Sequence, residues 1–403
     1  MPEQYFLTWN RQVGAASLPV YAARKDEFIL KDGQKLYDFT STSFQANFGH
    51  SCEPIRQRIH QQLDRMAIAS PKAIFSLKEI VSRRLLDFLE LDDGEANLGK
   101  LFYTVSGSES VENALKIARH WTGRDIVLAR KNSYHGASLG SMSVSGDWRS
   151  EPHLNFSAGT VRIPEPEDDP DATKAAAVIQ QTGPDKIAAI IVETISGTNG
   201  VVIPPQSWWD GISNLCRQHG ILLICDEVLA GFGRTGRPFA FHHFGLRPDL
   251  VCMSKAISGG YVPFGAVWVS DEIAARYDDE VLACGLTNYG HPLGLAALDA
   301  VLDLLTDVSF AAQKQQLEMT FAELVTRFAD QHKDVSGFRQ RGLLAAIDFH
   351  GDLPPWQSFI DAGVYVCLKD NMLILAPPFI SQPDRLERAF QVLDKVFDTM
   401  ASN

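Results

Sequence analysis

The 403-residue sequence predicts an α/β protein with two domains. The large domain covers residues 51–294 and is built on a mainly parallel sheet between helical layers, and the smaller α+β domain combines residues 1–50 and 295–403. Short apolar runs alternate with helical segments between about residues 53 and 290. Most of these runs lack polar alternation, as expected for strands covered on both faces. After about residue 294, long helices precede a group of short strands.

The segments of the large domain alternate between two types. Residues 111–121 carry apolar side chains at helical spacing, among them Val111, Leu115 and Ala118. Alternation of such helices with covered strands is typical of a parallel sheet with helices on both faces. The predicted strands are the segments 100–105 (KLFYTV), 125–130 (DIVLAR), 187–193 (IAAIIVE), 221–227 (ILLICDE), 249–254 (DLVCMS) and 265–270 (GAVWVS).

The small domain is predicted from both ends of the chain. Residues 20–40 predict a hairpin that turns at Asp32-Gly33, a favoured hairpin dipeptide. A hairpin alone is marginally stable, so we expect it to join the C-terminal strands. The C-terminal half is predicted to contain a helix over 293–305, a second helix, strands at 343–349, 364–368 and 372–377, and a last helix from Asp384.

Composition narrows the class of protein. The net charge of −12 argues against nucleic acid or an anionic membrane as the main partner. The N-terminus shows no signal-peptide pattern and no apolar run is long enough to span a bilayer, so we expect a cytoplasmic protein. The cysteines are scattered without CxxC spacing, which favours free thiols over disulfides or a metal site. They are Cys52, Cys216, Cys225, Cys252, Cys284 and Cys367.

The loop after the strand at 100–105 is a candidate anion site. Ser106-Gly107-Ser108 opens the following helix, where free N–H groups and the helix dipole attract negative charge. Glycine lets a ligand approach the backbone closely, and the serines add hydroxyl donors. The plain alternative is a helix cap, because Ser106 and Glu109 have capping-box spacing.

Three further candidates follow other strands, where ligands of open α/β sheets bind. Asp226 ends an apolar strand, so its carboxylate needs a strong partner; a buried ion pair or helix cap is the alternative. Lys255 follows a buried strand, and a buried amine loses its proton readily and becomes nucleophilic; a snorkelling lysine is the alternative. Tyr134, before His135, could stack on a flat ligand or be an ordinary loop aromatic. Together these groups match the needs of pyridoxal phosphate.

The sequence resembles the class III aminotransferases, which are fold-type-I pyridoxal phosphate enzymes, over nearly its whole length. The most specific stretch is DEVLAGFGRTG over 226–236, followed by Pro248-Asp249 and Ser254-Lys255-Ala256. SGSES (106–110), Tyr134-His135-Gly136, the glutamate of IIVETISGTNGV and Thr287 with GHP (290–292) support the match.

This resemblance implies roles for the candidate residues. Lys255 would be the Schiff-base lysine and proton shuttle, and Asp226 would pair with the pyridine nitrogen. Val228 and Tyr134 would cover opposite faces of the ring. Ser106, Gly107 and Ser108 would hold the phosphate, with His135 beside Tyr134 and Glu193 near the substrate and the cofactor oxygen.

The family's threonine that matches Thr287 reaches the phosphate of the neighbouring subunit, which implies a homodimer with shared sites. The implied reaction moves an amino group from an amine or ω-amino acid to a small keto acid, pyruvate being expected, by ping-pong kinetics. The GHP, SGDWR (145–149) and FLTW (6–9) segments resemble most the ω-amino acid:pyruvate and taurine:pyruvate branch.

Substrate residues are harder to assign. Ile374 stands where many relatives carry an α-carboxylate arginine, which speaks against an acetylornithine-type substrate. Cys367 aligns with the mobile arginine of ω-transaminases; Lys369 is a replacement candidate or a solvated turn residue. Three aromatic side chains align with segments that line the substrate pocket or serve in ordinary packing, namely Trp9, Phe44 and Phe75.

Alternatives remain on the same scaffold, namely an aminomutase, a racemase or a decarboxylating transaminase, because all retain the lysine and the aspartate. From other classes come a non-catalytic relative that binds a ligand or partner, and a nucleotide-binding protein that uses SGSES as its phosphate loop. The presence of both Lys255 and Asp226 argues against a non-catalytic relative.

Overall fold

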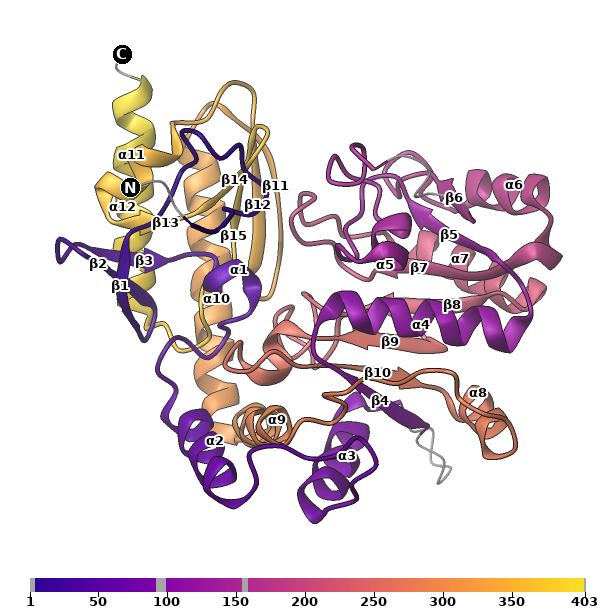
Figure 1. The fold of residues 1–403 in the computed structure, drawn as a ribbon. Coiled ribbons are helices and arrows are strands. Elements are labelled where there is room, and N and C mark those ends of the chain that lie inside the picture. The colour runs from indigo at the N-terminus through magenta and orange to yellow at the C-terminus, as the bar shows by residue number, and fades with distance from the viewer. Residues whose placement is uncertain (1–3, 92–98, 154–158, 402–403) are drawn as a thin grey trace.

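The computed structural model describes residues 4–91, 99–153 and 159–401. Its centre is a seven-stranded sheet in the order β4-β10-β9-β8-β7-β5-β6, in which only β10 runs against the other strands (Figure 1). The predicted strands are all present, and β6 is one that the sequence analysis did not include. The strands are β4 (Lys100–Thr104), β5 (Ile126–Arg130), β6 (Thr160–Ile163), β7 (Ile187–Glu193), β8 (Leu222–Asp226), β9 (Leu250–Met253) and β10 (Gly265–Val269).

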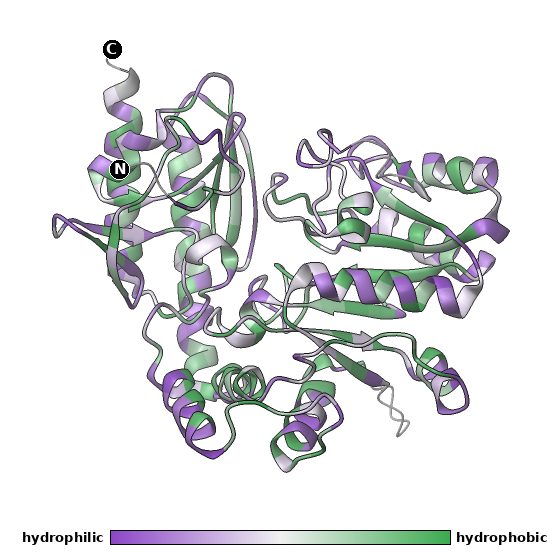
Figure 2. Ribbon diagram, viewed as in Figure 1, coloured by the Kyte–Doolittle hydropathy of each residue, from purple (hydrophilic) through white to green (hydrophobic). Residues whose placement is uncertain are grey.

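Successive residues of the central strands serve two cores, which explains why the strands show no polar alternation. In β7, Ile191 packs with the helix α4 on one face, whereas Ile190 and Val192 belong to the main core on the other face. The strands are accordingly apolar along their length (Figure 2). The helices around the sheet are α2 (Glu53–Arg65), α3 (Ser76–Leu89), α4 (Gly107–Thr122), α5 (Leu139–Val144), α6 (Thr173–Thr182), α7 (Gln206–His219), α8 (Asp271–Ala275) and α9 (Pro292–Thr306).

The C-terminal part forms an antiparallel sheet, β11-β12-β15-β14, beside the long helix α10 (Figure 1). The strand β11 was not predicted: its residues alternate between exposed and partly buried and carry polar side chains, so its apolar signal is weak. The elements are α10 (Val308–Gln331), β11 (Val335–Arg341), β12 (Leu344–Phe349), α11 (Trp356–Ala362), β13 (Val364–Tyr365), β14 (Cys367–Lys369), β15 (Met372–Leu375) and α12 (Pro383–Ala401).

The N-terminal strands form a meander of three, β1 (Val20–Arg24), β2 (Glu27–Leu30) and β3 (Lys35–Asp38), where a single hairpin was predicted. The predicted turn at Asp32-Gly33 lies between β2 and β3. An unpredicted second turn at Lys25-Asp26 is possible because Lys25 adopts a left-handed φ of 50°. The expected link to the C-terminal strands is confirmed, since β3 pairs with β13.

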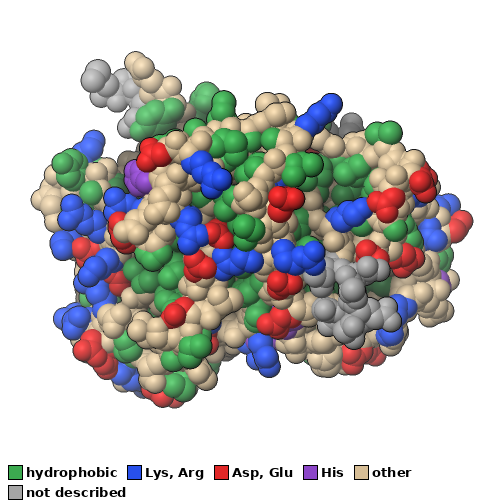
Figure 3. All heavy atoms as spheres, turned by 90° about the horizontal axis from the view of Figure 1, so that it is seen from below, with side chains coloured by type: hydrophobic (Ala, Val, Ile, Leu, Met, Phe, Trp, Pro, Cys, Tyr) green, Lys and Arg blue, Asp and Glu red, His purple; other side chains and the backbone are tan. Residues whose placement is uncertain are grey.

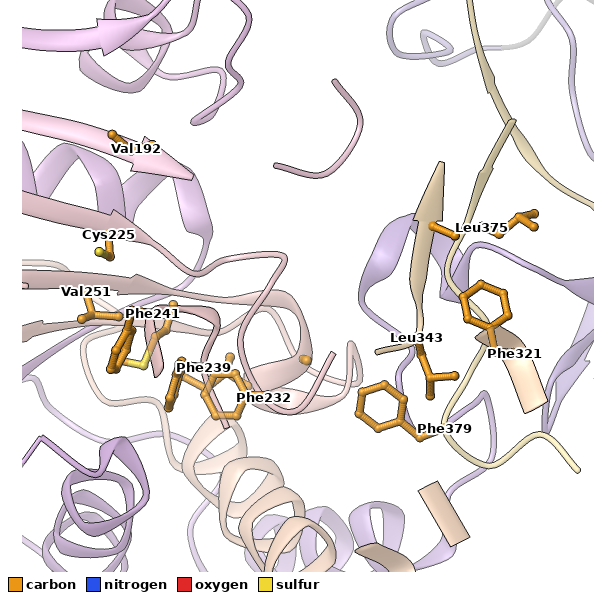
Figure 4. Packing of buried hydrophobic residues seen from close by; sticks show 14 of the residues in the cluster. Val192, Cys225, Phe232, Phe239, Phe241, Val251, Phe321, Leu343, Leu375 and Phe379 are labelled. Carbon is orange, nitrogen blue, oxygen red and sulfur yellow. The ribbon is translucent and has the colours of Figure 1, made fainter. Parts of the chain in front are cut away.

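Aromatic packing continues from the ends of the central strands toward the C-terminal sheet (Figure 4). Phe232, Phe239 and Phe241 pack with ring centroids 5.2 and 5.6 Å apart in succession. Phe379 and Leu343 belong to the same buried cluster on the C-terminal side. Four short 3-10 helices complete the described elements, η1 (Pro184–Lys186), η2 (Ala240–Phe244), η3 (Lys255–Ser258) and η4 (Arg276–Asp278). Within the described ranges, no helix has the length and apolar character needed to cross a membrane.

Candidate active site

A cavity of about 750 Å³ opens beyond the carboxyl ends of the parallel strands, where α/β sheets bind their ligands. The C-terminal sheet and the N-terminal segment close it from the other side. Most of the residues predicted from sequence line this cavity. They are Trp9, Phe44, Ser106, Gly107, Ser108, Tyr134, His135, Glu193, Asp226, Val228 and Lys255.

The start of α4 is compatible with both interpretations of SGSES, the helix cap and the anion site. Ser106 caps the helix, because its Oγ accepts the Glu109 N–H at 3.2 Å. The Glu109 carboxylate accepts the Val105 N–H at 2.9 Å. The N–H groups of Gly107 and Ser108 bind no acceptor in the described part of the chain. These two free donors at a helix N-terminus remain available for an anion.

Gly107 is needed because Val228 approaches its backbone closely. A Cβ built on Gly107 would lie 2.9 Å from Cγ1 and 3.1 Å from Cγ2 of Val228. Contacts this short force a neighbour to move, so even alanine is disfavoured here. The anion site and the Val228 side chain are therefore held next to each other.

Asp226 lies at the end of β8 and is 5% exposed. Its Oδ2 is 2.7 Å from Nδ1 of the buried His135, and its Oδ1 accepts the Val228 N–H at 3.0 Å. His135 Nε2 is buried and has no partner among the described residues, so a proton on Nδ1, donated to Asp226, is the favoured arrangement. The carboxylate is thus held in a fixed position at the cavity.

Lys255 begins η3 directly after β9, with a left-handed φ of 49° that costs a non-glycine residue about 1–3 kcal/mol. Its Nζ lies 5.8 Å from the centroid of the Phe44 ring and forms no hydrogen bond within the described ranges. Burial lowers the pKa of the Lys255 amine, while the charges of Asp226 and Glu193 oppose that effect. An amine with a lowered pKa is more often neutral and nucleophilic.

Glu193 ends β7 in register with Asp226 on β8, so the two carboxylates lie side by side. Glu193 Oε1 accepts the Tyr134 N–H and its Oε2 accepts the Gly197 N–H, both at 3.1 Å. Glu193 therefore orients the loop that carries Tyr134 and the loop that follows β7.

Phe44 is positioned by an unusual backbone. The element α1 (Ser41–Phe44) is a left-handed turn in which φ runs from 45° to 68°. The buried Asp38 stabilises this turn by accepting the N–H groups of Thr40 at 3.0 Å and Thr42 at 2.7 Å. Sustained left-handed conformation is rare for non-glycine residues, and such strain clusters at functional sites.

Arg149 is a charged residue of the cavity that the sequence analysis did not identify as a site residue. Its guanidinium carbon lies 4.2 Å from the centroid of the Tyr134 ring and 5.3 Å from that of Trp9. The only signal in the sequence was the segment SGDWR, which places an arginine next to an acid and an aromatic. One of these rings, Trp9, comes about 140 residues earlier in the chain.

Three predicted residues do not line the cavity of their own chain. Phe75 precedes α3 and packs, partly buried, against the main core. Lys369 donates its Nζ hydrogen bond to Asn199. Thr287 is exposed in the loop before α9. In the described part of the chain, no group of three histidine, cysteine or acidic residues could hold a metal ion.

The sheet order, the strand-end lysine and aspartate, and the anion site together define a fold-type-I pyridoxal phosphate enzyme. The chain belongs to the class III aminotransferases, since the model of that family matches residues 10–397, and the predicted resemblance is confirmed.

Relatives cover almost the whole chain. The omega-aminotransferase of Caulobacter vibrioides is 29% identical over 429 residues, covering 98% of this chain and 95% of that protein. The acetylornithine aminotransferase of Methanothermobacter thermautotrophicus is 29% identical over 360 residues, covering 88% and 87%. A taurine:2-oxoglutarate aminotransferase from Bifidobacterium kashiwanohense, solved with pyridoxal phosphate and glutamate, superimposes with a TM-score of 0.91 at 32% identity, covering 100% and 97%. These relatives are named for different amino donors, so the family defines the reaction class.

The cavity fits the cofactor of this family. The free amide groups of Gly107 and Ser108 suit a phosphate, and the valine methyls held against Gly107 suit one face of a flat ring. The buried Asp226 carboxylate suits a protonated ring nitrogen, and the Lys255 amine, which pairs with no residue in the described ranges, suits an aldehyde. The volume of about 750 Å³ lies within the usual range for cofactor sites.

Proposed function

We propose that this aminotransferase moves the amino group of an ω-amino acid or amine to a small keto acid, with pyruvate as the acceptor, in a ping-pong reaction. The observation that carries this proposal is the Lys255 amine, which lines the cavity together with Asp226 and forms no hydrogen bond or ion pair with any described residue. A structural lysine in such a place would be paired, because an unpaired buried charge is costly.

When bound, pyridoxal phosphate supplies an electron sink that stabilises negative charge on the substrate carbon. The side chains of this protein supply the rest. Gly107 and Ser108 would bind the phosphate, and Asp226, held by His135, would keep the ring nitrogen protonated. Lys255 would attach the cofactor and, once displaced by substrate, move the proton between the two reacting carbons.

The nature of the donor is argued from two positions in the C-terminal sheet. Ile374 lies fully buried in β15, and Cys367 lines the cavity from β14. Neither side chain carries the charge of the arginine that other members of the family have at these positions, which favours an ω-amino acid or an amine as the donor. The names of the omega-aminotransferase and the taurine:2-oxoglutarate aminotransferase agree with such a donor.

The test is a panel of ω-amino acids, taurine, aromatic amines and diamines, each with pyruvate or 2-oxoglutarate. We expect alanine to form from pyruvate, and the product ketone or aldehyde to appear in equal amounts. Initial rates measured over a range of donor concentrations at several fixed acceptor concentrations should give the parallel double-reciprocal lines of ping-pong kinetics. Racemisation or migration of the amino group without alanine would instead favour a racemase or aminomutase, and carbon dioxide release a decarboxylating enzyme.

We also propose a homodimer in which Thr287 serves the neighbouring site. Exposed apolar side chains on α2, α3 and the segment between them support a covered face (Figure 3): Leu63 is 48%, Ile68 77%, Ile74 82% and Ile80 56% exposed. The loop of Thr287 adjoins this face, because Lys78 of α3 lies 4.8 Å over the Tyr289 ring.

Mixing two inactive proteins tests the shared site. In a hybrid of Lys255→Ala and Thr287→Val subunits, one site regains both intact residues only if Thr287 acts across the interface. We expect activity to reappear after mixing and sedimentation to show twice the chain mass. Activity that stays absent in proven hybrids would contradict the shared site.

The cytoplasm is the proposed location. All six cysteines are free and no two form a disulfide. Free thiols suit a reducing compartment. Cell fractionation with detection of the native chain tests this, and recovery in a secreted fraction would contradict it.

A further inference from the structure

Arg149 lines the cavity but has no role in the proposed transfer of the amino group. Of the lysine and arginine side chains in the described ranges, Arg149 and Lys255 line the cavity. Lys255 is the reacting amine under the proposed function. Arg149 is therefore the fixed cation that remains for a substrate.

Asp147 holds Arg149 in one orientation. The Asp147 carboxylate accepts the Arg149 backbone N–H at 3.0 Å through Oδ1 and Nη1 at 2.8 Å through Oδ2. Both side chains are shielded, with exposed fractions of 5% for Asp147 and 16% for Arg149. A guanidinium fixed in this way loses little conformational freedom when it binds a ligand.

Aromatic rings surround the guanidinium. Its carbon lies 4.2 Å from the Tyr134 centroid, 5.3 Å from the Trp9 centroid and 5.7 Å from the Trp148 centroid. Such rings stabilise a cation over their faces and exclude water. Charge-assisted hydrogen bonds are stronger in these surroundings.

Arg149 still has donors to offer. Nη1 binds Asp147, but Nε is buried without a partner and Nη2 donates to no described residue. The two oxygens of a carboxylate or sulfonate match two parallel N–H donors of this kind. An unpaired buried donor is costly, and a bound acid would satisfy it.

The charge of Arg149 reaches the reacting amine. Burial is the largest cause that lowers the pKa of Lys255, and the charges of Asp226 and Glu193 raise it. The positive charge of Arg149 adds a smaller lowering of the same pKa. Arg149 and Lys255 line the same cavity, so Arg149 borders the space that a substrate bound near Lys255 would fill. Of the other positions considered for an acid-binding cation, Cys367 and Ile374 carry no charge, and Lys369 donates to Asn199 and does not line the cavity.

We propose that Arg149 binds the acidic group of the substrate, so that the enzyme selects amines bearing a carboxylate or sulfonate over neutral amines of the same length. This inference rests on the proposed aminotransferase function. It makes Arg149 a specificity-determining residue and Asp147 the residue that positions it.

The donor half-reaction measures this selectivity without an acceptor. The cofactor-loaded enzyme is mixed with β-alanine, taurine or 3-aminopropan-1-ol, and the loss of visible cofactor absorbance is followed by stopped flow. In Arg149→Gln, we expect kcat/KM for the preferred acidic donor to fall about 10- to 100-fold, the loss of charge-assisted hydrogen bonds. The neutral alcohol should change less than about threefold. An equal change for acid and alcohol, or no change for either acid, would overturn the proposal.

Binding of an unreactive acid gives a second readout. We expect 3-hydroxypropanoate, which has no amine, to quench tryptophan fluorescence in the wild type and to bind at least about 10-fold more weakly to Arg149→Gln. Arg149→Lys keeps the charge but loses the planar fork, so an intermediate effect is expected, and it decides the matter if the glutamine variant does not fold. Asp147→Asn should weaken acid binding less than Arg149→Gln.

A matched control tests whether the effect requires the loss of the arginine in the cavity or follows from the loss of any positive charge. Arg217→Gln removes an exposed arginine at the end of α7, where its guanidinium contacts Asn214, and should leave the acid-to-alcohol ratio unchanged. If the wild type reacts with no donor at all, the proposed function fails. If the wild type transaminates but Arg149→Gln leaves the ratio unchanged, only the role of Arg149 fails.

Discussion

Replacing the strand-end carboxylate by its neutral isostere, Asp226→Asn, should separate catalysis from folding. Asp226 is 5% exposed, so its attraction to a cation is weakly screened. At the effective dielectric constant of such a site, opposite unit charges in contact attract by about 4 kcal/mol. A neutral hydrogen bond would retain about 1 kcal/mol of this. The remaining loss of about 3 kcal/mol corresponds to a fall of about 100-fold in kcat.

The fold should survive the same change at a modest cost. The asparagine Oδ1 can still accept the Val228 N–H, as Asp226 does at 3.0 Å. An amide nitrogen facing His135 Nδ1 would move the imidazole proton to Nε2, which is buried without a partner in the described part of the chain. That unpaired donor lowers the free energy of unfolding by about 1–3 kcal/mol.

Stopped-flow absorbance of the donor half-reaction measures the rate, and urea unfolding measures the stability. The matched control is Asp249→Asn, which neutralises a carboxylate at the opposite end of the neighbouring strand β9, where Asp249 accepts the Leu223 N–H at 2.7 Å. We expect the control to keep near-wild-type rates. If Asp226→Asn, with cofactor bound, also reacted at the wild-type rate, the role of Asp226 at the ring nitrogen would be refuted.

Three further changes test other parts of the site and the fold. Lys255→Ala should abolish both alanine formation and the visible absorbance, since no other described lysine lines the cavity; retained transamination would contradict its role. Gly107→Ala places a Cβ 2.9 Å from Val228 and should weaken cofactor binding about 10-fold in a titration, with partial recovery when Val228→Ala is added. Burial raises the pKa of Glu227 from 4.5 to about 7, so its contribution to stability is complete below pH 4.5 and is lost as the pH rises to about 7, by about 3 kcal/mol. Glu227→Gln should therefore flatten the stability profile between pH 5 and pH 8 in urea unfolding, and an unchanged slope would count against this assignment.

The sequence alone was sufficient for six of the seven strands of the central sheet, all but β6, and for the residues at the ends of those strands. A strand covered on both faces needs apolar side chains at every position, so β7, β8 and β9 stand out without reference to the rest of the chain. Parallel strands bring their carboxyl ends to one edge. Asp226 and Lys255 could therefore be placed together from local patterns.

Only the tertiary structure revealed the residues that complete the cavity. The left-handed turn at Ser41–Phe44 depends on the buried Asp38, and nothing in the sequence of that turn predicts its backbone. Arg149 lies against Trp9, which comes about 140 positions earlier. The strand β13 pairs with β3 more than 300 residues away, and this pairing brings the two ends of the chain together.

There is a physical reason why the strand-end residues could be predicted from the sequence and the rest of the cavity could not. Burial of a strand and the capping of a helix are decided by side chains a few positions apart, so the sequence determined most of the central sheet and the position of Lys255 and Asp226 at the ends of its strands. Which cation meets which aromatic ring across a cavity is decided by how whole elements pack, because such contacts form between distant segments once the hydrophobic core has fixed their distance and angle. For this reason, the sequence determined the class of chemistry, and the packing of the N-terminal segment against the loop of Arg149 decided the lining of the cavity.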